Sequence, residues 1–488
     1  MSAAAGDPST AGSLPTAELR AVVEQTWLRH VVPTLHDYIR IPAKSPSFDR
    51  DWADHGHIDR ALELVHGWAA DRPIAGMATR EVRLPGRTPV LVCDIPPAAG
   101  GSPDETVLLY GHLDKQPEMV GWAEGKGPWE PVLEGERLFG RGGADDGYAL
   151  FAALTAVEAL QTVGGAHSRL VVLIEASEES GSPDLPAYVD HLAAGLGRVD
   201  LVVCLDSGCA TYDTLWVTTS LRGLVGGTLD VRVLSEGIHS GVAGGIVPSS
   251  FRIARQLLSR IEDEADGRVL LGEAGAEIPP ARRREAEAAA AELGDAVASY
   301  FPWSGATSPR SADTAEQVLD RTWRPALEVT GFDGAPPPGD AGNVLRPATR
   351  LKLSLRLPPT ADDAAAAEAL RSVLEADPPN GADVRFDIQD VGPGWEAPAT
   401  APWLAAALDS ASREAFGRPA RSQGEGGSIP FMGMLGERFP SAQFVVTGVL
   451  GPGSNAHGPN EFLDLPTARG LTVAVSHLLN AHSTRNAG

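Results

Sequence analysis

The segment LVVLIEASEESG, residues 170–181, joins an apolar run rich in β-branched side chains to a turn with two adjacent glutamates. Such a run predicts a buried strand, and the acidic turn places titratable side chains at the end of that strand. Two further segments repeat the arrangement, VLLYGHLD at 107–114 and LVVCLDSG at 201–208, and QFVVT at 443–447 is a fourth candidate strand. The chain therefore predicts several buried strands, three of which end in polar side chains.

Helical patterns alternate with these strands. Residues 146–163 have the apolar spacing and alanine content of a helix, residues 16–41 also look helical, and Pro466 begins a helix that runs to about residue 482. This alternation predicts an α/β fold in which a mostly parallel sheet is flanked by helices. Because ligands bind such sheets beyond the carboxyl ends of the strands, the polar side chains there are expected to share one crevice.

The middle of the chain has a different pattern, with half-exposed strands and amphipathic helices. The predicted strands are residues 227–233 and 350–357, the predicted helices 249–261, 282–300 and 361–375, and a Pro/Gly-rich loop spans 332–342. This pattern predicts a smaller α+β domain, residues 219–392, inserted into a larger domain made of residues 16–218 and 393–488. Residues 1–15 lack a basic start and an apolar run, so we interpret them as a disordered tail and not as a signal peptide.

Composition excludes several kinds of protein. At 488 residues the chain exceeds the usual size of one domain, and its 43% hydrophobic and 21% charged residues are typical of a globular protein. A formal net charge of −24 argues against binding to nucleic acid or to an anionic membrane surface. No run approaches the ~20 apolar residues of a membrane span. The three cysteines form no CxxC pair, which favours a reducing, cytoplasmic location.

Seven side chains in or near the turns are candidates for metal chemistry. His112 can bind zinc while Asp114, two residues on, accepts its other N–H. Asp145 stands where a glycine-rich turn meets a helix, and a carboxylate there can bridge two cations. Of two adjacent glutamates, one can bind metal while the other faces an attacking water. The whole set is His112, Asp114, Asp145, Glu178, Glu179, Asp206 and His457.

Each of these features alone has a simpler interpretation. A histidine at a strand end is commonly a satisfied polar residue, and Asp145 fits a helix N-cap. Adjacent glutamates are ordinary in a chain with 64 Asp and Glu residues. Spacing by itself therefore leaves the metal site open.

Motifs with a shared order run along nearly the whole chain: GHLD at 111–114, GRGGADD at 140–146, EESGS at 178–182, LDSG at 205–208, HSG at 239–241, EGGSIP at 425–430 and AHGPNE at 456–461. In these motifs the chain resembles the di-zinc metallopeptidases that include carnosinases, cytosolic dipeptidases, aminoacylase and carboxypeptidases of the G type. The segments HSGVAGG and EGGSIP are similar to the carnosinase and dipeptidase branch in particular.

The resemblance implies how two metal ions are held in the larger, catalytic domain. His112 and Asp206 would bind one ion, Glu179 and His457 the other, and Asp145 would bridge both. Two zinc ions per subunit are implied, with manganese or cobalt as alternatives. Glu178 would then be the general base.

The resemblance also gives the inserted domain the roles of lid and dimerisation domain. His239 would reach across a homodimer interface and stabilise the oxyanion in the site of the other subunit. Two positions depart from the dipeptidase branch, because Gly424 stands where Arg is common and Asn343 where Thr is often found. Both departures affect the expected side-chain preference.

Several residues are implied to bind the substrate. Arg356 matches an arginine that grips a carboxylate, a task suited to a guanidinium group. Gly427 and Ser428 would bind the peptide backbone, and Glu425 would lie near the substrate amine. The implied substrate-binding set is Arg356, Asn343, Glu425, Gly427 and Ser428.

Together, these implications predict a hydrolase that cleaves the amide bond of dipeptides or small peptide-like substrates. The water would be bridged between two metal ions, with Glu178 as general base. An N-acyl-amino-acid deacylase is the alternative, since it would share the metals and Arg356. An alternative of another class is a catalytically silent metal-binding subunit, against which the presence of Glu178 argues. The expected partners are a small peptide and a second copy of the chain, with neither nucleic acid nor membrane.

Overall fold

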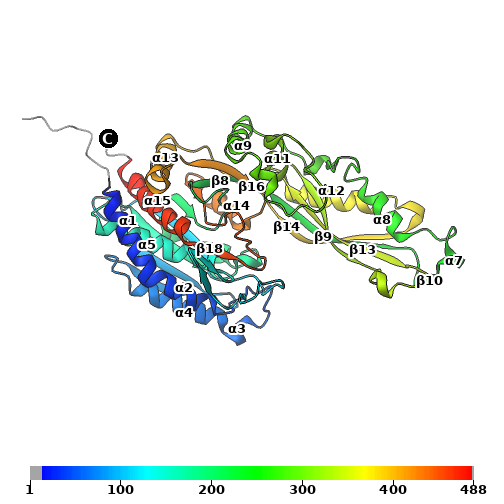
Figure 1. Ribbon diagram of the computed structural model, residues 1–488, viewed down its shortest axis with the longest axis horizontal. Coiled ribbons are helices and arrows are strands. Elements are labelled where there is room, and N and C mark those ends of the chain that lie inside the picture. The colour runs from blue at the N-terminus through cyan, green and yellow to red at the C-terminus, as the bar shows by residue number, and fades with distance from the viewer. Residues whose placement is uncertain (1–13, 486–488) are drawn as a thin grey trace, which may run out of the picture. The chain divides into compact units, whose positions relative to one another are not determined.

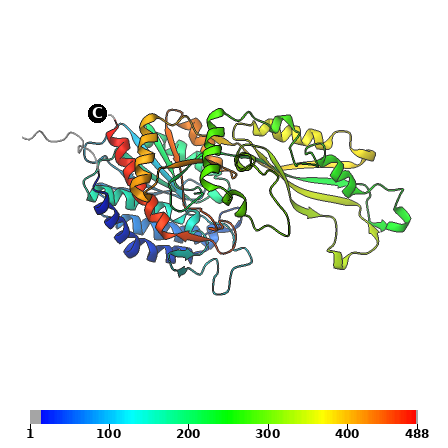
Figure 2. The ribbon, with the colours of Figure 1, turned by 45° about the horizontal axis from the view of Figure 1, so that its top comes forward.

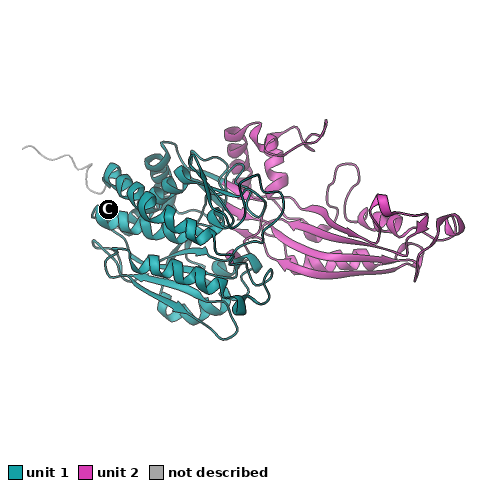
Figure 3. Cartoon of the chain, turned by 60° about the horizontal axis from the view of Figure 1, so that its bottom comes forward, with its two compact units in different colours: residues 1–218, 397–422, 434–488 teal, residues 219–396, 423–433 magenta. Residues whose placement is uncertain are grey.

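The computed structural model describes residues 14–485, which form two compact units (Figure 3). Of the described residues, unit 1 contains 14–218, 397–422 and 434–485, and unit 2 contains 219–396 and 423–433. From the sequence we predicted that the inserted domain ends at residue 392, four residues before the end of the first segment of unit 2, and we did not assign residues 423–433 to it. Residues 1–13, most of the predicted tail, lie outside the described part of the chain.

Unit 1 is built on a large mixed sheet (Figure 1). In spatial order, seven of its nine strands are β1 (Ala78–Val82), β2 (Val90–Ile95), β6 (Arg169–Glu175), β3 (Thr106–His112), β7 (Val199–Cys204), β17 (Gln443–Val446) and β8 (Trp216–Leu221). The strands β6, β3, β7 and β17 pair in parallel, whereas β1, β2 and β8 pair antiparallel with their neighbours. The predicted α/β fold is confirmed, and its parallel part is the centre of the sheet.

Helices cover this sheet because its central strands are apolar on both faces. Every residue of β3 is buried, as expected for a strand between two helical layers. The blue α1 and the red α15 lie side by side in both views (Figure 1, Figure 2) and share a core with α5. The helices of unit 1 are α1 (Thr16–Thr26), α2 (Val32–Ile39), α3 (Trp52–His55), α4 (His57–Ala70), α5 (Ala149–Thr162), α6 (Leu185–Leu196), α13 (Pro402–Phe416), most of α14 (Pro430–Arg438) and α15 (Leu465–Thr484).

Two predicted helices of unit 1 are interrupted. A π-helical turn at Trp27–Val31 separates α1 from α2, and Pro33 stands in the first turn of α2. The helix expected from residue 146 begins only at Ala149, since Asp145 and Asp146 adopt non-helical dihedral angles. A small antiparallel sheet of β4 (Val132–Glu134), β5 (Arg137–Phe139) and β18 (Phe462–Asp464) completes the unit.

Unit 2 contains a four-stranded antiparallel sheet in the order β11 (Ala326–Asp333), β13 (Ala348–Leu357), β9 (Gly223–Arg232) and β14 (Asp383–Gly392). The helices α8 (Ser250–Leu258) and α12 (Asp363–Glu375) pack on one face of it, because alternate residues of β13 are buried against them. A separate small core joins α9 (Pro280–Leu293), α10 (Ala296–Ser299) and α11 (Thr314–Thr322).

The helix predicted over residues 282–300 is divided into α9 and α10. Gly294, with a φ of 52°, ends α9 in a conformation that a helix cannot continue. The remaining short elements of unit 2 are β10 (Ile238–His239), α7 (Ser240–Ala243), β12 (Val344–Leu345) and β15 (Trp395–Glu396). In the part of the chain that the structure describes, none of the helices has the length and apolar character needed to span a bilayer.

Candidate metal centre

The carboxyl ends of three adjacent parallel strands bring possible metal ligands to one edge of the sheet. His112 is the last residue of β3, Glu178 and Glu179 lie in a short turn after β6, and Asp206 follows β7. Because β6, β3 and β7 are neighbours, their ends converge. His112 Nε2 lies 3.8 Å from Asp206 Oδ1 and 4.0 Å from Glu178 Oε2.

Asp145 lies between the two histidines of the centre. Its Oδ1 is 3.3 Å from His112 Nε2, and its Oδ2 is 3.0 Å from His457 Nε2. His457 Nε2 is also 3.4 Å from Glu179 Oε2. The Asp145 carboxylate therefore touches two groups of ligands, one on each of its oxygens, as a bridging ligand must.

The donor set fits two divalent cations. Ligand atoms of His112, Glu178 and Asp206 lie within 4.8 Å of one another, and so do those of His112, Asp145 and Glu179. Glu179 Oε1 is buried without a hydrogen-bond partner, so it has a lone pair free for a cation. Imidazole nitrogens together with carboxylate oxygens suit zinc, and also manganese or cobalt.

Crowding of negative charge controls protonation in the centre. Burial and the charge of Asp206 raise the pKa of Glu178 well above its usual value. Burial and the charge of Asp145 raise the pKa of Glu179 to about 8. Burial disfavours a charged His457, but the hydrogen bond with Asp145 and the negative charges of Asp145, Glu179 and Glu461 together outweigh this effect and raise its pKa to about 9. Bound cations would compete with these protons, which couples metal binding to proton release.

Asp114 supports the centre through the backbone. His112 Nδ1 lies 3.0 Å from the carbonyl oxygen of Asp114, whereas the nearest oxygen of the Asp114 carboxylate is 3.6 Å away. That carboxylate instead accepts the backbone N–H of Glu178 at 3.1 Å and of Glu179 at 3.0 Å. From the sequence we expected the Asp114 carboxylate to fix the His112 tautomer. The Asp114 carbonyl is better placed for that role, and the carboxylate instead orders the turn of Glu178 and Glu179.

Three residues near the centre were not assigned to it from the sequence. Arg141 and Glu461 form a buried ion pair behind the turns of the centre, with 2.6 Å between Nη1 and Oε2. Gln116 Nε2 donates to Glu179 Oε2 at 2.5 Å. Their positions in the sequence could have indicated a role in the centre, because all three lie within, or two residues beyond, the motifs that carry the other ligands.

In unit 2, Arg356 lies beside the glycine-rich segment that follows β16 (Arg421–Glu425). Arg356 Nη1 donates to Ser428 Oγ at 3.2 Å, and Arg222 N donates to the carbonyl of Gly427 at 3.1 Å. Within residues 14–485 Arg356 forms no ion pair, so its guanidinium is available to a ligand. Glu425 is half-buried, and burial raises its pKa.

His239 and Asn343 lie together in another part of unit 2. His239 pairs with Val344 between β10 and β12, and the carbonyl of Asn343 accepts the N–H of Ser240 at 2.8 Å. Both residues are exposed. β13 runs from the neighbourhood of His239 and Asn343 to Arg356. At ~3.3 Å per residue, its length puts more than about 25 Å between them. The six predicted residues of unit 2 therefore form two groups.

Close packing explains why residue 424 is glycine. A Cβ added there would lie 2.7 Å from Ser220 Oγ and 2.9 Å from Thr322 Cβ. Both distances are too short for a side chain, so this backbone excludes the arginine that is common in the dipeptidase branch.

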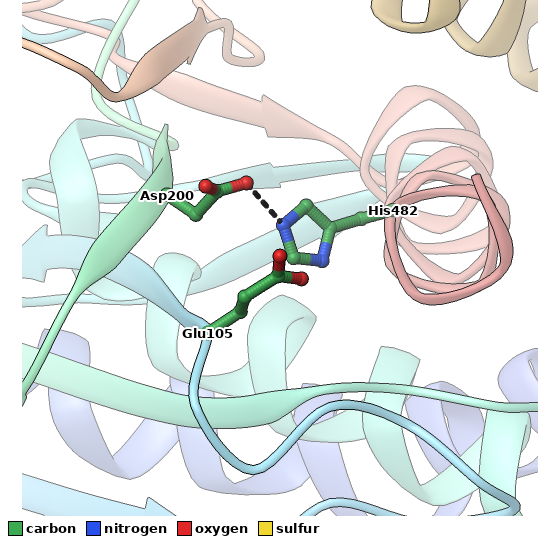
Figure 4. Close-up of side chains that lie close together, drawn as sticks. All are labelled: Glu105, Asp200 and His482. Carbon is green, nitrogen blue, oxygen red and sulfur yellow. Dashed lines mark hydrogen bonds and ion pairs between the residues drawn. The ribbon is translucent and has the colours of Figure 1, made fainter. Parts of the chain in front are cut away.

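A second group of possible ligands lies elsewhere in unit 1, where Glu105, Asp200 and His482 face one another (Figure 4). Arg485 Nη2 lies 2.6 Å from Asp200 Oδ2 and 2.9 Å from Glu105 Oε2, and Arg198 lies 2.7 Å from Glu105 Oε1. Two guanidinium groups thus already neutralise the two carboxylates. This group is an ion-pair network that fastens α15 to the starts of β3 and β7.

Comparison with known proteins shows the family of the chain. The sequence model of the peptidase family M20/M25/M40 matches residues 108–481. A cysteinylglycine-S-conjugate dipeptidase of Corynebacterium striatum is 27% identical over 386 residues, which cover 77% of this chain and 80% of that protein.

Two solved structures share the fold. The dipeptidase Dug1p of Saccharomyces cerevisiae has a TM-score of 0.77 at 21% identity, with 96% of this chain and 98% of that chain covered. Human carnosine dipeptidase 1 has a TM-score of 0.73 at 20% identity, with 96% and 99% covered. The fold of the chain is thus that of solved peptidase structures.

Proposed function

The chain belongs to peptidase family M20/M25/M40, and on this premise we propose that it is a dipeptidase that works with two zinc ions. One observation carries the proposal: five ligand side chains and Glu178 meet at a single edge of the sheet in unit 1. A relative named as a cysteinylglycine-S-conjugate dipeptidase supports a small peptide with a free carboxylate as the substrate.

The proposed assignment of ligands follows the distances around Asp145. His112 and Asp206 would hold one ion, Glu179 and His457 the other, and Asp145 both. When bound, the ions supply a polarised scissile carbonyl and a water that is acidic near neutral pH. Manganese or cobalt would suit the same donors, so zinc itself is part of the proposal.

Glu178 is the proposed general base. Only 12% of its side chain is exposed, and its Oε2 points towards the ligands at 4.0 Å from His112 Nε2. Its backbone is held by the Asp114 carboxylate. From this position Glu178 would take a proton from the attacking water and later deliver it to the leaving amine. A silent binding subunit would have no chemical use for a carboxylate held in this way.

We assign substrate binding to residues of unit 2. Arg356 would pair with the substrate carboxylate, because a guanidinium group can donate two parallel hydrogen bonds to it. Ser428 and Gly427 lie next to Arg356 and would bind the peptide backbone. Glu425 would meet the substrate amine, and Asn343 would act with His239.

We also propose a homodimer formed through unit 2, in which His239 completes the site of the other subunit. Val242 is 68% exposed, Ile246 84% and Val344 43%, and all lie close to His239 in the sequence or across the β10–β12 pair. Exposed apolar side chains gathered in this way are typical of a protein interface. The sequence contains no CxxC pair, which supports the proposed cytoplasmic location.

A substrate panel tests the proposal. Zinc-reconstituted protein is offered unblocked dipeptides and, separately, N-acetyl amino acids of matching side chains. The proposal expects turnover of the dipeptides and little of the N-acetyl compounds. Turnover of the N-acetyl compounds alone would replace it by the deacylase alternative, and no turnover of either would favour a silent subunit.

A further inference from the structure

A buried ion pair links the turns that carry Asp145 and His457. Arg141 Nη1 lies 2.6 Å from Glu461 Oε2, and the two side chains are 1% and 0% exposed. Burying such a pair gives little net stability, because both charges lose their hydration. Because the pair lies between two turns that carry candidate ligands, it can instead position those turns.

Glu461 holds the turn of Asp145 through its second oxygen. Glu461 Oε1 lies 2.9 Å from the backbone nitrogen of Gly142. The nitrogens of Ala144 and Asp145 follow at 3.3 and 3.4 Å. Three N–H groups directed at one carboxylate oxygen fix the peptide planes in front of α5. They therefore fix the direction in which the Asp145 side chain leaves the backbone.

Arg141 holds the turn of His457. Its Nη2 donates to the carbonyl of Gly458, the next residue, at 2.7 Å. His457 needs support because its φ of 63° lies in the left-handed region, which costs a residue other than glycine free energy. The His457 side chain is also 56% exposed, whereas those of Asp145 and Glu179 are 6% and 3% exposed. It is thus the least enclosed of these ligands.

We propose that Arg141 and Glu461 are positioning residues whose ion pair chiefly sets the affinity of the cation bound by Glu179 and His457. The other cation depends less on the pair, because its own ligands follow buried strand ends directly. The inference rests on the proposed function, since it takes the two-cation centre as given. Neither residue of the pair needs to touch the substrate.

Zinc titration of variants tests the proposal. Glu461→Gln removes the charge but keeps an oxygen of the same reach, and Arg141→Lys keeps the charge but loses the fork that contacts Glu461 and Gly458 together. Metal-free protein is titrated with zinc against a chromophoric chelator, which yields the number of ions and two dissociation constants. We expect one constant to rise about 10–100-fold in Arg141→Lys while the other stays close to the wild-type value, and Glu461→Gln to raise the same constant more than the other.

Two further variants identify the affected cation. His457→Ala shows which constant belongs to the His457 side, and adding Arg141→Lys to it should cause little further loss there, because Arg141 acts through the turn of His457. Asp94→Asn serves as the control. It breaks the ion pair with Arg169, which has the same 2.6 Å length elsewhere in unit 1, and should leave both constants unchanged.

Two results would overturn the inference: unchanged constants in both Glu461→Gln and Arg141→Lys, or an equal loss for both cations. Thermal unfolding of the metal-free variants separates loss of affinity from loss of folding, and Arg141→Lys decides the matter if Glu461→Gln does not fold. The titration does not depend on turnover of a dipeptide. Wild-type protein that binds fewer than two ions would instead contradict the proposed function.

Discussion

The metal centre of unit 1 and the His239 segment of unit 2 differ in how much of their surroundings one chain supplies. His112 and Asp206 are at most 9% exposed, and each ligand of the centre lies within hydrogen-bond or ion-pair distance of another. His239 is exposed, in a short strand beside apolar side chains that are exposed as well. The first region is complete within its unit, whereas the second presents its residues outward.

The two parts of the proposed activity therefore reside in regions of different exposure. Chemistry that needs fixed distances between charges is placed where one unit holds all the candidate ligands, at buried strand ends and in the turns of Asp145 and His457. A residue that serves a second copy of the chain must be exposed in the single chain. The predictions below test the two regions separately, beginning with the variant expected to have the largest effect.

Glu178→Gln should lower turnover without releasing the bound zinc. Glutamine keeps the shape but cannot accept the proton, so we expect kcat to fall by about 10²–10⁴-fold. Zinc content should stay at two ions per chain. Steady-state kinetics and metal analysis measure both, with exposed Glu134→Gln as the matched control. Undiminished turnover would remove Glu178 from the mechanism.

His239→Ala should remove the oxyanion stabilisation that we propose for unit 2. Loss of an oxyanion stabiliser is expected to lower kcat about 10²–10³-fold, with zinc content and thermal unfolding unchanged. Mixing this variant with Glu178→Gln gives the sharper test. If His239 acts in the other subunit, mixed dimers regain one working site, and activity returns to about a quarter of wild type after random exchange.

No recovery on mixing, with both variants shown to exchange subunits, would place His239 in its own chain. A fully active monomer would contradict the proposed dimer. In either case the comparison between the two regions would need to be redrawn, since unit 2 would then serve its own chain alone.

Arg356→Met should affect binding more than chemistry. Hydrogen bonds to a charged group are worth about 1.5–3 kcal/mol, so we expect KM for a dipeptide to rise roughly 10–100-fold. A dipeptide amide, which has no carboxylate, should show little difference between the variant and the wild type. An equal loss for both substrates would mean that Arg356 supports the fold of unit 2 and does not bind a carboxylate.

The smallest expected effect concerns His482, in the ion-pair network at the other end of the strands. Burial, followed by the charge of Arg485, lowers the pKa of His482, so the folded protein favours the neutral ring. The unfolded chain then binds more protons below the ordinary pKa of about 6.5. Stability is therefore complete above that pH and declines as the pH falls towards the folded pKa.

Urea unfolding of metal-free protein at pH 7.5 and 5.5 measures this effect. The loss between the two pH values should be smaller in His482→Gln than in the wild type. Equal losses would show that other groups dominate the pH dependence. Zinc binding should be the same in both proteins, because the network lies apart from the metal centre.

The sequence predicted the parts of the molecule that rest on local patterns. Apolar runs gave the central strands, and because those strands are parallel, the residues after them had to share an edge. Local patterns could not show the pairing of Arg141 with Glu461, because 320 residues separate them. They also could not show that the Asp114 carbonyl, and not its carboxylate, faces His112, since that depends on the turn after β3.

The central claim is that two cations share the Asp145 carboxylate. Diffraction from crystals of zinc-loaded protein, collected on both sides of the zinc absorption edge, tests it directly. We expect two anomalous peaks about 3.5–4 Å apart, one beside His112 and one beside His457, with Asp145 between them. A single peak, or peaks that Asp145 does not reach, would contradict it.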